Sequence, residues 1–301
     1  MKTSNLFGLC ALALCCTACE KENVYDGNSD SEDKVEKAFK VNSVISQTEP
    51  ATRAPQLDEN GAGTFTQGDK NTLLFLTNAN KVVKSFEYTY GNSYMWSDLG
   101  LPEDMTSGKV TAWYPAVTAA NPQAFEWDIT TAANPDLLVA SAAAIQVDQE
   151  NPVQLTFKHK MHKLHVEVVS GDASITESDL NNATITCRNY FPKVSMNLIE
   201  ATSGAVSGEL QTSTVMAQKS DFIVPAQAAG TIEVEINVKN KSSIFKIAET
   251  EINGQLVKAL ESGKSLSLII TVTKSEMKLT IGTAIEGWEN QGEKNDNIII
   301  G

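Results

Sequence analysis

Cysteine is scarce beyond the first residues of this 301-residue chain. Of its five cysteines, four lie within the first 19 residues, and only Cys187 follows them. No disulfide can therefore form within residues 20–301, so folded domains there must be held together by hydrophobic cores. Cys187 alternates with apolar neighbours in ATITCR, a pattern that predicts a buried, unreactive strand residue instead of a nucleophile.

Signatures of catalysis and of nucleic-acid binding are missing as well. The chain has no serine-hydrolase, zinc-protease, P-loop or dinucleotide-binding motif, and none of its carboxylates is singled out as an acid/base pair. Asp and Glu total 37 against 24 Lys and Arg, and the resulting net charge of −13 repels phosphate backbones. We therefore predict a protein that is not an enzyme, needs no cofactor and has no nucleic-acid partner.

Long apolar runs are also few, and the clearest one lies at the N-terminus. A cationic residue precedes an apolar stretch from Leu6 to Cys16, which is too short to span a bilayer and is typical of a signal peptide. Two small residues then precede Cys19. We predict that residues 1–18 are a signal peptide and that cleavage falls immediately before Cys19.

Small residues before a cysteine resemble the lipobox of bacterial lipoproteins, in which that cysteine is lipidated. One departure is Cys16, at the position where the lipobox usually has leucine. The resemblance implies a lipid on Cys19 and a surface-exposed lipoprotein of the cell outer membrane, held by acyl chains at about 0.8 kcal/mol per buried CH₂. A secreted form without lipid stays open as an alternative.

The next segment, residues 19–36, is polar and acid-rich, with too little apolar surface to fold. We predict that it is a flexible tether between the membrane and the first domain. Acidic and amide residues alternate here as in a calcium loop, but Ser31 and Lys37 stand where such a loop needs Gly and Glu. A calcium site is therefore disfavoured.

From residue 37 onward, short runs rich in Val, Ile, Thr and aromatic residues alternate with turn-forming residues, which predicts an all-β protein. About seven such runs fill residues 37–150 and a similar series fills residues 151–301, so we predict one β-sandwich domain in each. The polar segment VDQENP marks the predicted boundary. The alanine-rich run Ala140–Ala144 is compatible with a single helical turn.

All three histidines of the chain lie in the segment VQLTFKHKMHKLHVEVV, at His159, His162 and His165. On a helix they would share about a third of the circumference and suit a metal ion. The flanking residues are β-formers, however, and on a strand the histidines spread over both faces, too far apart for one zinc ion. We therefore predict no metal site.

The same segment changes its hydrophobic parity. Apolar positions are odd before the histidines and even after them, which predicts a bulge or a crossing near Lys160–Lys163 that flips the inward face. We expect the lysines of the segment on the solvated face of a strand, and a nucleic-acid-binding basic patch is the weaker interpretation. These lysines are Lys158, Lys160 and Lys163.

Several motifs together resemble the fimbrillin family of Bacteroidetes, the lipoprotein pilins and pilus-associated proteins of the FimA and Mfa types. Their order and spacing carry the resemblance, which covers nearly the whole mature chain. The motifs are the lipobox-like Cys19, ATRAP around Arg53, FTQGDKNTLLFLT, VTAWYPA, LLVAS, VQLTFKHKMHKLHVEV, DFIVPAQ and the segment from Leu260 to Trp288.

The resemblance implies two tandem transthyretin-like Greek-key β-sandwich domains and a structural role in a fimbrium that supports cell adhesion. In polymerising members a protease cuts after an arginine that follows the first strand, and a strand of a neighbouring subunit fills the groove left behind. Arg53, followed by Ala54, matches this position after the expected first strand, Lys37–Thr48. The other arginine, Arg188, lies within an expected strand.

The partners implied are other fimbrial subunits, the outer membrane and a host surface ligand. The apolar C-terminal residues are a candidate donor strand, or the last strand of their own sheet; they are Ile298, Ile299 and Ile300. An anchor or tip protein that stays uncut also fits the family.

The alternative function is a surface lipoprotein that binds glycans or host ligands through a sandwich face and does not polymerise. Aromatic side chains exposed together on one face would favour it. We expect the tryptophans in the cores instead; they are Trp96, Trp113, Trp127 and Trp288.

Overall fold

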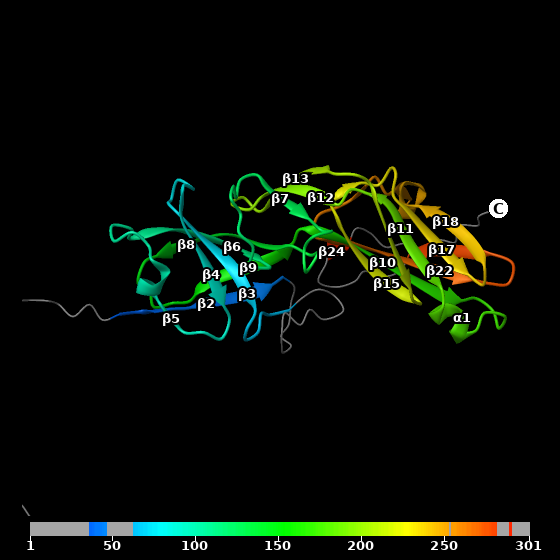
Figure 1. Cartoon of the computed structure of the whole chain (residues 1–301), viewed down its shortest axis with the longest axis horizontal. Helices are drawn as coiled ribbons and strands as arrows, with labels where there is room; N and C mark the ends of the chain where they lie inside the picture. Colours follow the sequence, from blue (N-terminus) through cyan, green and yellow to red (C-terminus); the bar gives the residue numbers. More distant parts are fainter. Residues whose placement is uncertain (1–35, 47–62, 253, 282–288, 291–301) are drawn as a thin grey trace, which may run out of the picture. The chain divides into compact units, whose positions relative to one another are not determined.

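The computed structural model describes residues 36–46, 63–252, 254–281 and 289–290. Within these ranges the chain is almost entirely β-strand (Figure 1), with one short α-helix, α1 (Glu177–Asn181), and two 3₁₀ turns, η1 (Trp96–Leu99) and η2 (Ile247–Glu249). The all-β prediction is confirmed. No helix in this part of the chain is long and apolar enough to cross a membrane.

The first half of the chain is organised around a six-stranded sheet. We call residues 36–159 the first half and the residues from 160 onward the second half; β9 (Val153–His159) pairs in parallel with β2 (Val41–Ile45) and antiparallel with β8 (Leu138–Gln146). In order across the sheet the strands are β2 (Val41–Ile45), β9 (Val153–His159), β8 (Leu138–Gln146), β6 (Ser107–Tyr114), β3 (Lys70–Leu76) and β4 (Val82–Thr89).

Two sheets of the second half pack face to face, because side chains from both meet in one core (Figure 1). One has the order β15 (Lys219–Pro225), β10 (Met161–Ser170), β22 (Lys264–Val272) and β23 (Met277–Ile281), with β24 (Glu289–Asn290) also pairing with β22. The other has the order β14 (Gln211–Met216), β11 (Thr184–Tyr190), β17 (Glu233–Val238) and β18 (Lys241–Lys246).

Smaller sheets complete the fold. A three-stranded sheet has the order β13 (Thr202–Ser207), β12 (Lys193–Asn197) and β7 (Phe125–Asp128), so it joins strands from the two halves. The two-stranded pairs are β1 (Ala38–Phe39) with β5 (Tyr94–Met95), β16 (Gln227–Ala228) with β21 (Ala259–Leu260), and β19 (Glu251–Ile252) with β20 (Gln255–Leu256).

The interior strand β3 is buried on both faces of the six-stranded sheet, which explains its continuous apolar run, whereas β4 and β9 alternate with exposed positions. Leu73 and Phe75 face one core, shared with Trp96 and Phe157, whereas Leu74 and Leu76 face another. A strand that is buried on both faces has an unbroken run of hydrophobic residues in its sequence, without the alternation of a half-buried strand.

The core on the second face of the six-stranded sheet combines residues from the two halves, and we call it the bridging core. Trp113 and Val139 of the first half meet Met161, Val194 and Met196 of the second half there. The Thr111 hydroxyl also lies between two carbonyl oxygens, 2.7 Å from that of Ala140 in its own sheet and 3.0 Å from that of Leu198 in the other half. The two halves are therefore coupled by packing as well as by the chain.

The predicted domain boundary falls in the loop between β8 and β9, which are neighbours in one sheet. The chain leaves this sheet at Lys160, between β9 and β10. The division into two domains stays a prediction, and strand pairing favours Lys160 over residue 150 as the point of division.

The predicted parity switch is confirmed at that same point. The buried positions of β9 are odd, at 153, 155, 157 and 159, and those in the core of β10 are even, at 164, 166 and 168. The face changes because β9 belongs to the six-stranded sheet and β10 to a different one.

Two expectations about local structure were wrong. Ala140–Ala144 belongs to strand β8 and forms no helical turn, because Ala140 and Ala143 pair with β6. Lys160 and Lys163 do not lie on a solvated face: Lys160 is partly buried, with its ammonium donating to the Ala201 carbonyl at 2.7 Å, and Lys163 is buried beside Asp221 at 3.0 Å. Lys158 is exposed as expected.

Candidate functional site

The first described strands, β1 and β2, alternate between inward and outward side chains, as a strand at the edge of a sandwich should. Phe39 and Ile45 are buried at 3% and 2% exposure, whereas Asn42 is exposed and Val44 is 44% exposed. The odd positions therefore form an apolar row that faces the core. We call β1 and β2 together the first strand, and the surface that they cover the first-strand groove.

Phe39 fills an aromatic pocket in the groove. Its ring lies edge-on to Trp96 at a centroid distance of 4.9 Å, and 6.1 Å from the rings of both Phe75 and Tyr88. Edge-to-face and tilted pairs at these distances are favourable beyond the area that they bury. The pocket thus selects a large aromatic side chain at this position.

Ser43 adds a polar contact in the middle of the apolar row. The Tyr90 hydroxyl donates to Ser43 Oγ at 2.6 Å and accepts a hydrogen bond from Asn71 Nδ2 at 2.8 Å. Burial raises the pKa of Tyr90, although its hydrogen bonds to Ser43 and Asn71 oppose the shift. The hydroxyl therefore stays protonated and fixes the position of the strand along the groove.

Backbone hydrogen bonds hold the first strand along its length. Val153 N donates to Lys40 O at 2.8 Å, Ser46 N donates to Phe157 O at 2.9 Å, and Trp96 N donates to Lys37 O at 3.0 Å. Since β2 is the last strand of its sheet among the residues that the structure describes, these bonds and the side chains of the odd positions attach it to the fold.

Every site residue predicted for lipidation, cleavage or strand donation lies outside the described residues. These are Cys19, Arg53, Ala54, Ile298, Ile299 and Ile300. The described ends on either side of Arg53 meet, because Ile45 N donates to Gly63 O at 3.0 Å. The groove next to this point was not predicted residue by residue, although the alternation of Phe39, Val41, Ser43 and Ile45 signals its inward row.

The histidines have separate partners. His159 lies 2.6 Å from Asp136, and both side chains are buried. His162 Nδ1 donates to Glu261 O at 3.0 Å, and His165 lies 2.6 Å from Asp221. No group of three or more potential metal ligands occurs among the residues that the structure describes.

The remaining predictions concern whether single side chains are buried or exposed. Cys187 is fully buried in β11, so the prediction of a buried strand residue is confirmed, and burial raises the pKa of its thiol to about 12. Trp96, Trp113 and Trp127 are each 4% exposed or less, so they form no aromatic platform. Trp288 lies outside the described residues.

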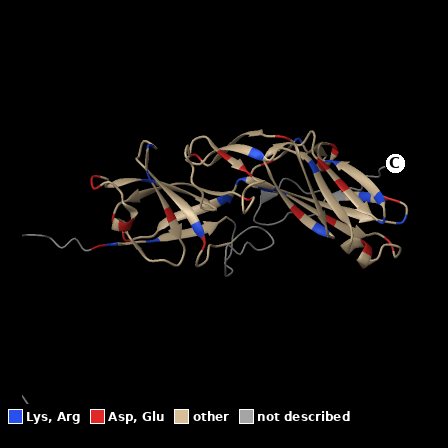
Figure 2. Cartoon of the chain, viewed as in Figure 1, with Lys and Arg blue, Asp and Glu red and all other residues tan. Residues whose placement is uncertain are grey.

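Charges are interspersed over the described strands (Figure 2), and ion pairs such as Lys193 with Glu126 at 2.9 Å join opposite signs. Arg188 likewise pairs with Glu235 across β11 and β17. This distribution gives no support to a basic patch.

The chain matches a known family. A family model described as "Fimbrillin-like" matches residues 52–288. The chain belongs to this fimbrillin-like family. Membership supports a structural role in fimbriae and cell adhesion, at the cell surface.

Solved structures from Bacteroides species share the fold. A candidate cell adhesion protein of Bacteroides uniformis ATCC 8492 matches with a TM-score of 0.64 and 16% identity, over 85% of this chain and 99% of that one. Another, of Bacteroides ovatus ATCC 8483, matches with a TM-score of 0.57 and 16% identity, over 84% and 98% of the two chains. No match to a curated protein sequence was found.

Proposed function

We propose that this fimbrillin-like chain is a subunit or an accessory anchor or tip protein of a cell-surface fimbria, exported as a lipoprotein and assembled by β-strand complementation. Cleavage after Arg53 separates the first strand from the rest of the chain. A strand of another subunit then occupies the first-strand groove.

The observation that carries the proposal is the way in which the first strand is held. It contributes two fully buried anchors, Phe39 and Ile45, each worth about 1.5–3 kcal/mol of burial. Without it, the aromatic pocket of Trp96 and the backbone of β9 would face water, so an exchanged strand gains the same contacts.

The candidate donor strand has part of the required pattern. Inward positions in the groove are two residues apart, and Ile298 and Ile300 have this spacing. They supply two adjacent apolar anchors, fewer than the row from Phe39 to Ile45 contains. A donor that satisfies the whole groove must therefore include further residues or come from a different subunit.

Polymerisation of the purified chain tests the proposal. The soluble form that begins at Glu20 is treated with an arginine-specific protease, and its mass is followed by light scattering. We expect cleavage after Arg53 and growth of oligomers, with neither in the Arg53→Gln variant. Cleaved protein that stays monomeric at high concentration would contradict a role as a polymerising subunit and leave the anchor and tip roles.

Lipidation is tested separately, in cells. The Cys19→Ala variant should leave the membrane fraction and lose incorporation of labelled fatty acid, because no acyl chain is then attached. Unchanged labelling of this variant would contradict lipidation at Cys19.

A further inference from the structure

One edge of the second-half sandwich is open. Strand β14 pairs only with β11, and β15 pairs only with β10, within the described residues. Ala217 and Gln218 join β14 to β15, so the chain passes there from one sheet to the other. Two hollows, of about 440 and 510 Å³, are lined by residues of these strands and of the link between them.

The smaller hollow lies between β14 and β15 and combines an apolar floor with hydroxyl and amide groups. Tyr190 and Phe222 belong to the sandwich core and reach the hollow with only 5% and 6% exposure, so its accessible apolar lining comes from Val215 and Ile223, with Ile129 and Pro135. The Tyr190 hydroxyl and Ser213 Oγ are 2.5 Å apart, so one hydroxyl donates to the other and a hydroxyl hydrogen is left for a ligand. Uncharged hydrogen-bonding groups also come from Thr212 and Gln211.

A single ionisable acid, Asp221, lines this smaller hollow, and its charge is already compensated. Asp221 lies 2.6 Å from His165 and 3.0 Å from Lys163. Burial pushes the pKa of Asp221 upward, but the bonds from His165 and Lys163 outweigh it and hold the pKa below its usual range. The hollow therefore presents little net charge to a ligand.

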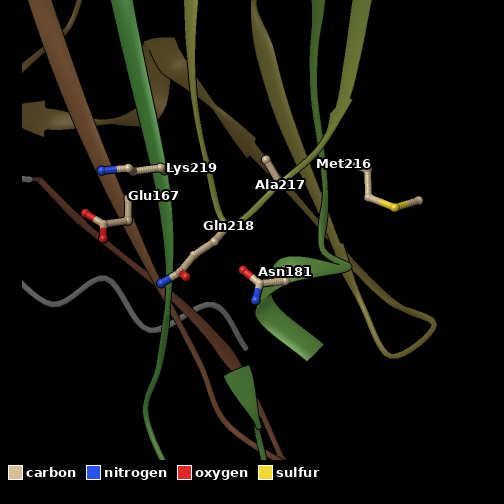
Figure 3. Close-up of a pocket in the computed structure, with 6 residues that line it drawn as sticks. All are labelled: Glu167, Asn181, Met216, Ala217, Gln218 and Lys219. Atoms are coloured by element: carbon tan, nitrogen blue, oxygen red, sulfur yellow. The ribbon is translucent and has the colours of Figure 1, made fainter. Parts of the chain in front are cut away.

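The larger hollow lies at the other end of the same edge (Figure 3) and is also close to neutral. Glu167 and Lys219, which pair in register across β10 and β15, bring opposite charges. Figure 3 shows the amides of Asn181 and Gln218 on one side, with the Met216 side chain pointing away from them. No side-chain hydrogen bond within the described chain involves either amide, so both are available to a ligand.

These features define a class of ligand. In a chain of net charge −13, an edge that gathers hydroxyls and amides with nearly balanced charge suits an uncharged ligand that is rich in hydroxyl groups. The accessible apolar side chains of Val215 and Ile223 suit the C–H face of a sugar ring, while the amides match pairs of hydroxyls.

We propose that the β14–β15 edge binds a neutral oligosaccharide, with sugar units in both hollows. The proposal goes beyond assembly, since it involves neither the first strand nor cleavage. An extended peptide that pairs with the free edge of β14 or β15 is the competing occupant, and the test separates the two.

Glycan binding by the uncleavable Arg53→Gln variant of the soluble chain tests the proposal independently of polymerisation. The probes are immobilised neutral oligosaccharides of glucose, xylose, mannose and galactose, together with acidic galacturonate and chondroitin oligosaccharides. Calorimetry then measures the dissociation constant for the neutral hexasaccharide that binds best. We expect binding to at least one of the neutral oligosaccharides. We expect no binding that depends on the charge of the probe.

Matched variants assign the binding to this edge. Asn181→Ala with Gln218→Ala removes the exposed amides, and we expect the dissociation constant to rise at least tenfold with thermal stability unchanged. Gln255→Ala removes an exposed amide from β20, away from the edge, and should have no effect. Absence of any neutral binder, preference for acidic probes, or equal binding by both variants would overturn the proposal.

The competing occupant is tested with the same protein. A seven-residue peptide with alternating valine and threonine should not compete with the hexasaccharide. If that peptide binds at the edge and the sugars do not, the site is a strand acceptor and the proposal is wrong.

Discussion

At the scale of single residues, His162 has the most perturbed environment of the three histidines. Its Nδ1 donates to Glu261 O, but its Nε2 is buried without a hydrogen-bond partner. Burial lowers the pKa of His162 to about 4 from its ordinary value of 6.5, although the contact with Glu261 opposes the shift. The ring is therefore neutral in the folded protein at neutral pH.

This state of His162 predicts a dependence of stability on pH. The unfolded chain binds the proton more readily, so stability is fully present above pH 6.5 and declines as pH falls toward 4. Between pH 7 and pH 5 the loss should be about 2 kcal/mol, at most about 1.4 kcal/mol per pH unit. Urea unfolding at the two pH values measures it.

The control is His162→Asn, which keeps a donor near Glu261 O but has no titrating ring. Its free energy of unfolding should change with pH by about 2 kcal/mol less than that of the natural protein over the same interval. Equal pH dependence in the two proteins would show that His162 titrates normally.

Cys187 gives a second prediction at this scale. Because the thiol is buried and its pKa is raised to about 12, a thiol reagent at pH 8 should not label the folded soluble chain. Labelling in denaturant should be complete, and its rate at intermediate denaturant should follow unfolding. Rapid labelling of the folded protein would contradict the burial of β11.

Residue environments were predictable from the sequence where the alternation was clear. Cys187, Trp113 and Trp127 fall on inward positions of strands, and their burial followed from that pattern. The prediction that Lys160 and Lys163 are solvated was wrong, because their partners are distant in sequence and are brought near by sheet pairing. These partners are Ala201 and Asp221. The local sequence of the histidine segment does not indicate those partners.

At the scale of elements, the first strand should contribute unequally along its length. Phe39→Ala should lower the free energy of unfolding of the uncut chain by about 3–5 kcal/mol, because the aromatic pocket loses its occupant. Val44→Ala is the matched control on the outward face and should change stability by less than about 0.5 kcal/mol. Urea unfolding distinguishes them, and similar effects for both would contradict the register of β2.

Most elements were predictable, but β13 and β14 were not. Their sequences, TSGAVS and QTSTVM, have small and hydroxylated residues and little apolar alternation, since both strands are largely exposed. Helix α1 carries a local signal, with Thr176 and Asp179 forming a capping box. The parallel pairing of β2 with β9 joins residues about a hundred positions apart, which periodicity does not encode.

At the scale of the whole molecule, strand β9 determines where the chain can be divided. A fragment of residues 37–150 lacks β9, which lies between β2 and β8 in the six-stranded sheet. We expect this fragment to be unfolded by circular dichroism, and the bridging core to make the intact residues 37–301 unfold as a unit. A folded fragment 37–150 with β-sheet spectra would contradict this sheet order.

The central claim is that the first strand occupies a groove that another strand can fill. The most direct measurement is fluorescence anisotropy of a labelled peptide of residues 36–46, added to protease-cleaved protein and to the uncleaved Arg53→Gln variant. We expect saturable binding to the cleaved protein alone, lost when the peptide carries Phe39→Ala. Equal binding to both proteins, or no binding to cleaved protein from which residues 36–53 have dissociated, would contradict it.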